Sequence, residues 1–190
     1  MKNTYFLFAL VLGLFNVTSA LAAPIPGTSS SAMMAPKLGI YRSPIGYEIK
    51  TASSGFKQVP APADNKFIET VYRHVAAEKN KSGNGTLTVR VDKLGKTTSL
   101  KKYVSRWQRE YPKYGFDLLG SKAFTQNNSQ GYVIDLINKS TNRQLRQVIF
   151  MSEAKKSAVI LTCRDNTKSF QATLKGCNEI IRSFSWKKTS

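Results

Sequence analysis

The runs GYVIDLI at Gly131–Ile137, LRQVIFM at Leu145–Met151 and AVILTC at Ala158–Cys163 decide the fold of this chain. All three are rich in β-branched or aromatic residues, which favour strands. Polar segments at Asn138–Arg143 and Ser152–Ser157 separate the runs and are typical of turns. Three strong strands joined by short turns predict an antiparallel meander.

An amphipathic helix is expected before the meander. Ser99 can cap its N-terminus, and Pro112 is expected to end it. Its apolar residues recur at helical spacing and form one stripe: Leu100, Tyr103, Val104, Trp107 and Tyr111. The other face carries cations, at Lys101, Lys102, Arg106 and Arg109. We therefore expect Tyr103 and Trp107 to face the core and the cations to face outward.

A second amphipathic helix is expected after the meander, starting at Asp165–Thr167. Its apolar residues at helical spacing are Phe170, Leu174, Cys177, Ile181 and Phe184. This spacing places Cys177 toward the core, where the last strand of the meander can present Cys163.

The segments before the first helix give weaker signals. Ile40–Tyr41 and Tyr47–Lys50 predict a hairpin, and Thr86–Val91 alternates as a strand. Gly55–Asp64 is expected to be a loop, because its prolines exclude regular helix. Phe67–Ala77 suits a helix or a strand, and its composition leans slightly to helix. Two further segments carry weak strand signals, and one carries a turn signal: Phe116–Leu119, Lys122–Thr125 and Lys81–Gly85.

The N-terminus predicts export. Lys2 precedes an apolar run at Tyr5–Phe15, and Ala20–Ala22 has the small residues of a cleavage site. This run is shorter than a membrane-spanning helix needs. We predict a signal peptide over residues 1–22, a flexible leader rich in proline and small polar residues over 23–37, and a domain over 38–188. The protein is expected to be periplasmic or secreted. Lipid attachment is not expected, because no cysteine lies near the cleavage site.

Cys163 and Cys177 are the two cysteines of the chain. In an oxidising compartment, two thiols in apolar surroundings indicate a structural disulfide. The short loop that it closes would contribute roughly 3 kcal/mol in the chain-entropy model. A redox or metal-binding pair is the alternative. The spacing is not Cys-x-x-Cys and the single histidine, His74, is distant in sequence, so we favour the disulfide.

The chain is strongly basic, with 29 lysines and arginines against 11 acidic residues. Such an excess of positive charge affects solubility and the choice of binding partner. It favours anionic surfaces such as phospholipid headgroups, acidic polymers or an acidic protein. A basic surface that is merely solvated, with no dedicated partner, is the alternative.

Several of these segments together resemble the PsbP-like α/β/α sandwich family, which is shared with a Ran-binding nuclear import factor and DcrB-type bacterial envelope proteins. The resemblance rests on Ser43–Tyr47, Thr88–Val91, Ile160–Cys163 and Cys177–Phe184, and it extends over most of Leu38–Trp186. It implies an α+β fold in which an antiparallel β-sheet is packed by helices. It also implies a strand at Phe67–Ala77, which we adopt, and a non-enzymatic role in binding or stabilising other proteins.

Catalytic groups are sparse. His74 has no second histidine to form an acid–base pair, and no Gly-x-Ser-x-Gly motif supports a hydrolase triad around it. Asp135 lies within an apolar strand, where it could face inward or pair with Arg146. We expect no enzyme activity, no metal and no cofactor.

These observations predict an exported, non-enzymatic binding or accessory protein of the cell envelope. A basic face made of Lys101, Lys102, Arg106, Arg109 and Lys113 would bind an anionic envelope component or an acidic protein, with peripheral membrane contact as a further option. A nucleic-acid partner is not expected, because the aromatic residues of this face are assigned to the core. The alternatives are a periplasmic chaperone or adaptor for a protein client, and a hydrolase that uses His74. The sequence predicts no oligomeric state.

Overall fold

The computed structural model describes residues 39–51, 54–75, 85–95, 98–154 and 156–187. The predicted signal peptide and leader, and residues 81–84 of the predicted turn, lie outside these ranges. The assignment of residues 1–37 therefore stays a prediction.

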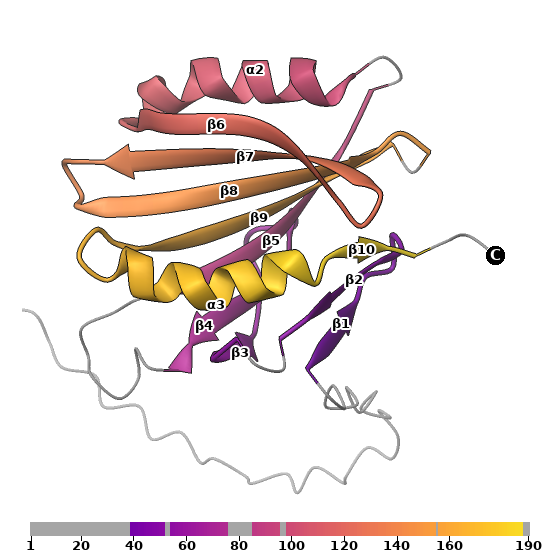
Figure 1. Ribbon diagram of the computed structural model, residues 1–190, viewed down its shortest axis with the longest axis horizontal. Helices are drawn as coiled ribbons and strands as arrows, with labels where there is room; N and C mark the ends of the chain where they lie inside the picture. Colours follow the sequence, from indigo (N-terminus) through magenta and orange to yellow (C-terminus); the bar gives the residue numbers. More distant parts are fainter. Residues whose placement is uncertain (1–38, 52–53, 76–84, 96–97, 155, 188–190) are drawn as a thin grey trace, which may run out of the picture. The chain divides into compact units, whose positions relative to one another are not determined.

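A large antiparallel sheet forms the centre of the described part of the chain (Figure 1). The three predicted strands of the meander are confirmed as its β7, β8 and β9, and each is longer than predicted. A fourth strand, β6, precedes them and covers the weak signals at Phe116–Leu119 and Lys122–Thr125 except for Phe116. From one edge to the other, the strands are β3 (Phe56–Val59), β4 (Ile68–His74), β5 (Thr86–Lys93), β9 (Ser157–Asn166), β8 (Arg143–Ser152), β7 (Ser129–Asn138) and β6 (Asp117–Gln126).

A smaller sheet contains the predicted hairpin. Strands β1 (Ile40–Arg42) and β2 (Tyr47–Lys50) pair antiparallel, with Tyr41 opposite Ile49. Strand β10 (Ser185–Trp186) pairs with the other side of β2. The hairpin is therefore confirmed, and it is held to the end of the chain.

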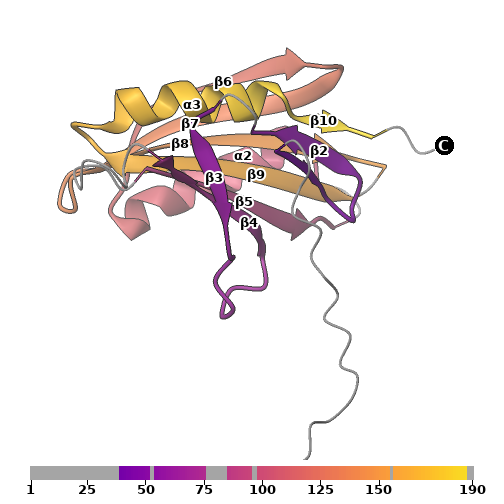
Figure 2. The same ribbon diagram turned by 90° about the horizontal axis from the view of Figure 1, so that it is seen from below.

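The predicted helices lie on opposite faces of the large sheet, as Figure 2 shows. Helix α2 (Leu100–Glu110) begins where expected, since the Ser99 hydroxyl accepts a hydrogen bond from the Lys102 backbone N–H at 3.3 Å. Pro112 does not end the helical turn, which continues as a 3-10 segment, η1 (Tyr111–Tyr114). Proline is tolerated there because the first turn of a helix needs no N–H donor at that position.

Helix α3 (Phe170–Arg182) starts later than the predicted Asp165–Thr167. Strand β9 continues to Asn166, which pairs with Arg143 of β8. Asp165 is buried and its carboxylate accepts a hydrogen bond from the Thr173 hydroxyl at 2.5 Å. Asp165 thus ties the strand to the helix and does not begin the helix.

One expectation for the first third of the domain fails, and one is confirmed. Gly55–Asp64 is not wholly a loop, because β3 forms there and pairs with β4 at the sheet edge. The strand adopted for Phe67–Ala77 from the family resemblance is confirmed at Ile68–His74, which is hydrogen-bonded on both sides, so the slight helical lean of the composition does not hold. In both segments, pairing with neighbouring strands overrides the local signal of the sequence.

Alternation along the strands divides the core into two halves. Residues such as Val159 and Leu161 pack toward α3 and the small sheet, whereas Ala158 and Ile160 pack toward α2. This arrangement is a helix–sheet–helix sandwich of the α+β class, as predicted. Cys163 and Cys177 form the predicted disulfide within the half that contains α3, with a Cα–Cα separation of 6.0 Å.

The small sheet is joined to the large one by hydroxyl groups and aromatic rings. The hydroxyls of Tyr41, Ser43 and Tyr47 all donate to Oε2 of Glu69, at 3.3, 2.8 and 2.5 Å. The Tyr47 ring also stacks on Phe184, with 5.5 Å between ring centroids, and Phe184 stacks in turn on Phe150 of β8. Burial, followed by the bond to Glu69, raises the pKa of Tyr47, so its hydroxyl remains a donor.

Gly176 tests the packing of α3. A Cβ at this position would lie 2.1 Å from the Ser54 carbonyl oxygen and 3.0 Å from the Phe56 ring. Glycine-to-alanine changes normally stabilise a helix interior. We expect Gly176→Ala to lower the free energy of unfolding by about 2 kcal/mol, because backbone must move to admit the methyl group.

Urea denaturation would measure this change. The exposed neighbour Lys175 supplies the control, Lys175→Ala, which is expected to leave stability nearly unchanged. A Gly176→Ala protein as stable as the parent, or more stable, would show that α3 is not seated this closely.

Candidate functional site

A hollow with a volume of about 1650 Å³ lies beside α2. We call it the α2 groove. One wall is α2 itself, and the others are the residues that precede β4, at Lys66 and Phe67, and the end of β5 with the residues after it, Arg90–Gly95. The segments that form it are therefore distant in sequence.

The groove exists because α2 covers only part of its face of the sheet. The core beneath α2 contains buried residues of β7, β8 and β9, and among the described residues it includes none of β4 or β5. In β5, Leu87 and Val89 are buried in the opposite half of the core. Strand alternation consequently directs Arg90 and Asp92 to the α2 side, where they are only partly covered.

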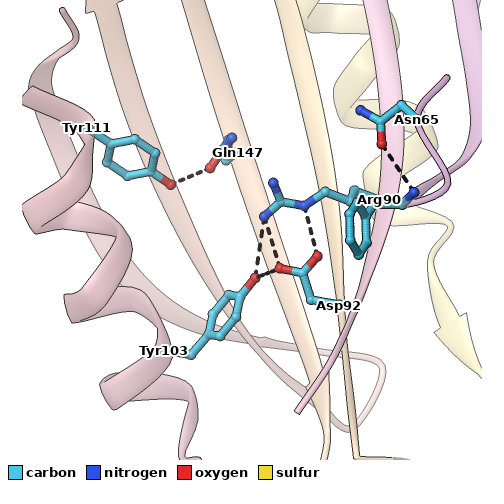
Figure 3. A network of polar contacts seen from close by, with 7 residues as sticks. Asn65, Arg90, Asp92, Tyr103, Tyr111 and Gln147 are labelled. Atoms are coloured by element: carbon cyan, nitrogen blue, oxygen red, sulfur yellow. Dashed lines mark hydrogen bonds and ion pairs between the residues drawn. The ribbon is translucent and has the colours of Figure 1, made fainter. Parts of the chain in front are cut away.

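A polar network fixes the floor of the groove (Figure 3). The Arg90 guanidinium forms an ion pair with Asp92, with Nε 3.0 Å from Oδ1. The Tyr103 hydroxyl of α2 donates to the other oxygen of Asp92. The Arg90 Cζ also lies 4.7 Å from the centroid of the Trp107 ring, a cation–π contact. Strand β5 and helix α2 are therefore linked directly at the groove.

Two tyrosines of this region have altered acidity. Burial, and then the hydrogen bond to Asp92, raises the pKa of Tyr103 to about 12. Burial also raises the pKa of Tyr111, whose hydroxyl donates to Gln147 of β8. Both hydroxyls thus stay protonated and hold α2 against the sheet throughout the physiological range.

The groove is strongly positive. Seven basic and two acidic residues line it. The acids, Asp92 and Glu69, are already engaged by Arg90 and by the three hydroxyls of the small sheet. The remaining cations form no ion pair with any acid in the described part of the chain; they are Lys66, Lys93, Lys101, Lys102, Arg106 and Arg109.

The structure brings together most of the predicted basic face. Lys101, Lys102, Arg106 and Arg109 all line the α2 groove. Lys113 does not: it belongs to η1 and forms an ion pair with Glu110 at 3.0 Å. Their role in binding stays a prediction.

The aromatic residues of α2 follow the predicted stripe. Tyr103 is buried, while Trp107 is half-buried between the core and the groove. Sequence reasoning missed Lys66 and the pair Arg90–Asp92. The alternation of β5 carried a signal for the pair, because two charged residues follow one another at spacing two on the face opposite Leu87 and Val89.

The two other candidate residues, His74 and Asp135, make contacts that are typical of structural residues. The His74 ring packs on Phe56, with 5.0 Å between ring centroids, and His74 lines neither hollow described in the structure. Asp135 pairs with Arg146 through two contacts of 2.7 and 2.8 Å, and this bond raises the pKa of Arg146. Among the described residues, no group of three or more histidine, cysteine or acidic residues could hold a metal ion.

Comparison with known proteins supports the fold. No protein-family model matches the sequence, and no curated protein does. Among solved structures, cyanobacterial PsbP from Synechocystis sp. PCC 6803 superposes with a TM-score of 0.58 and 12% identity, over 84% of this chain and 99% of that one. The chain has a PsbP-like fold.

Two further PsbP-like structures agree. LpqN of Mycobacterium tuberculosis, described as involved in cell envelope biogenesis, gives a TM-score of 0.57 at 11% identity, over 75% of this chain and 83% of that one. A point mutant of the protein Mog1 gives 0.50 at 11% identity, over 76% and 92%. At these identities the PsbP-like likeness concerns the fold alone.

The tyrosines of this PsbP-like domain provide a pH test. The pKa values of Tyr103 and Tyr72 rise from 10.0 to about 12 in the folded protein, for Tyr72 through burial. Between pH 10 and 12 the unfolded chain therefore loses protons that the folded chain keeps. Stability is fully present below pH 10 and is expected to fall as pH rises toward 12.

Ultraviolet absorbance of phenolate would follow this titration, with the urea-unfolded protein as reference. Tyr103→Phe should remove part of the delayed ionisation. Full ionisation of all tyrosines near pH 10 in the folded protein would contradict the buried network.

Proposed function

We propose that the protein is an exported, non-enzymatic binding protein of the cell envelope that holds an anionic partner in the α2 groove. One observation supports this proposal above the others: six cations without acidic partners in the described residues converge on one hollow. Cations that merely improve solubility would be spread over the surface. Focusing them in a concave site raises the local potential felt by an anion.

The floor of the groove is suited to binding. Arg90, Asp92, Tyr103 and Trp107 are fixed by mutual contacts, so little conformational entropy is lost there when a partner binds. The free cations of α2 are exposed at Lys101, Lys102, Arg106 and Arg109, where they can adapt to the partner. A rigid floor with exposed charged walls favours an anionic chain or headgroup.

Export has two supports. The first residues have the pattern of a signal peptide, and Cys163 and Cys177 form a disulfide of the kind that persists in oxidising compartments. No helix in the described ranges is long and apolar enough to cross a membrane. A periplasmic or secreted location follows from the proposal.

Catalysis at His74 is a weaker hypothesis. Its ring is occupied by contact with Phe56, and a Cβ at Gly55 would lie 3.3 Å from its Nε2, so its surroundings are closely packed. A role as an adaptor for a protein client has one favourable observation, the exposed apolar residues Tyr114, Leu118 and Leu119.

Charge reversal in the groove tests the proposal. We expect Lys102→Glu with Arg106→Glu to weaken binding of polyglutamate by at least about tenfold, because two free groove cations become acidic. The control, Lys57→Glu with Lys175→Glu, makes the same change in net charge on β3 and α3, away from the groove. It should weaken binding by less than about threefold.

Titration calorimetry at low and high salt would measure both effects. Binding to the parent protein should fall steeply as salt increases. Equal losses in the two double variants would show that net charge alone attracts the polymer. Binding that ignores salt would likewise contradict the proposal.

A further inference from the structure

Three large apolar side chains are exposed outside the α2 groove within one short stretch. The exposed fractions are 63% for Tyr114, 47% for Leu118 and 54% for Leu119. In the described part of the chain, Phe67 is the one other large apolar residue exposed in this way. Leu118 follows Tyr114 by four positions, so their Cα atoms lie within about 14 Å. We call Tyr114, Leu118 and Leu119 the edge patch.

An irregularity in β6 lies within this patch. Leu118 pairs with Leu136 and Gly120 with the adjacent Asp135, so Leu119 is an extra residue in the strand. Regular alternation would send consecutive leucines to opposite faces of the sheet. A bulge interrupts that alternation and re-aims side chains. Both leucines are left about half exposed at the outer edge of the sheet.

Two exposed lysines lie beside the edge patch: Lys113 precedes Tyr114, and Lys139 pairs with Asp117, which precedes Leu118. Lys113 and Lys139 have side chains that are 67% and 77% exposed, and each pairs with an acid, Glu110 or Asp117. Ion pairs this exposed are weak and exchange readily for other anions. The chain as a whole carries a formal charge of +18, which adds a long-range attraction to any anionic surface.

We propose that the edge patch is a contact site for the surface of an anionic lipid bilayer. Tyrosine favours the headgroup level, leucine the acyl boundary, and lysine extends toward phosphate along its apolar stem. None of the three patch residues lines either hollow described in the structure, so the patch lies outside these concave sites. A deformable bilayer can cover such an exposed surface. A few apolar side chains bind weakly alone, and the positive charge supplies the second attraction.

A protein partner fits the patch less well. Protein ligands commonly insert anchors into pockets or add a strand to a sheet edge. The patch lines no described hollow, and the irregularity at Leu119 interrupts the edge that another strand would join. Lys122 on the same exposed strand also discourages pairing with a second copy.

Vesicle sedimentation tests this site, using the protein recovered after export and vesicles of phosphatidylcholine with about 30% phosphatidylglycerol. Leu118→Asp with Leu119→Asp should lower the partition coefficient at least about tenfold, since two apolar contacts are lost. The control, Ala123→Asp with Thr125→Asp, adds the same charge at exposed positions of the same strand and should lower it less than about threefold.

A second readout locates the contact. Tryptophan introduced as Leu119→Trp should shift its emission to shorter wavelength on binding and be quenched by brominated lipid, relative to the parent protein. Equal losses in both aspartate variants, or an unquenched tryptophan, would overturn the proposal. A protein dimer that dissociates in the Leu118→Asp, Leu119→Asp variant would also overturn the proposal. Loss of polyglutamate binding in the Lys102→Glu, Arg106→Glu variant tests the α2 groove alone. The vesicle experiment tests the edge patch, so either proposal can fail without the other.

Discussion

Strand β9 must be buried on both of its faces, and the rest of the structure follows from this constraint. Val159, Leu161 and Cys163 contribute to one half of the core, while Ala158 and Ile160 contribute to the other. A strand with two apolar faces requires a cover on each side. Helix α2 supplies one cover, and α3 with the small sheet supplies the other, so the sandwich is the arrangement that removes both faces from water.

The two covers differ in extent, and this difference positions the groove. Helix α3 is fixed to β9 by the disulfide between Cys163 and Cys177 and by the bond between Thr173 and Asp165. Helix α2 packs over β7, β8 and β9, and its connection to β5 is the polar network of Arg90, Asp92 and Tyr103. Because that network replaces apolar packing, charged groups remain accessible beside α2, where a ligand of opposite charge can reach them.

The sequence predicted the parts of the fold whose signal is local. The strong strands, the Ser99 cap and the stripe of α2 have high intrinsic preference and clear periodicity, and the structure confirms them. The sequence could not predict β3, because its pairing partner lies beyond a loop. Nor could it predict the start of α3, which depends on how far β9 and β8 remain paired. Local spacing favoured a helix at Ile68–His74, and pairing with two neighbouring strands decided otherwise.

The candidate site shows the same limit. Helical spacing identified four cations of the groove, because one helix carries them all. It did not identify Lys66 or Arg90, which reach the groove only through the tertiary arrangement of β4 and β5. It included Lys113, which the 3-10 turn after α2 carries away from the groove into a pair with Glu110. Long-range strand order is what the sequence alone does not reveal.

Photo-crosslinking in the native host would test most directly the proposal that an anionic partner binds in the α2 groove. A photoreactive amino acid at Ser105, an exposed residue that lines the groove, would be compared with one at Gln171, which is exposed on α3. The account predicts a salt-sensitive adduct with an anionic component from position 105 and none from position 171. Adducts of the same component from both positions, or from position 171 alone, would contradict it.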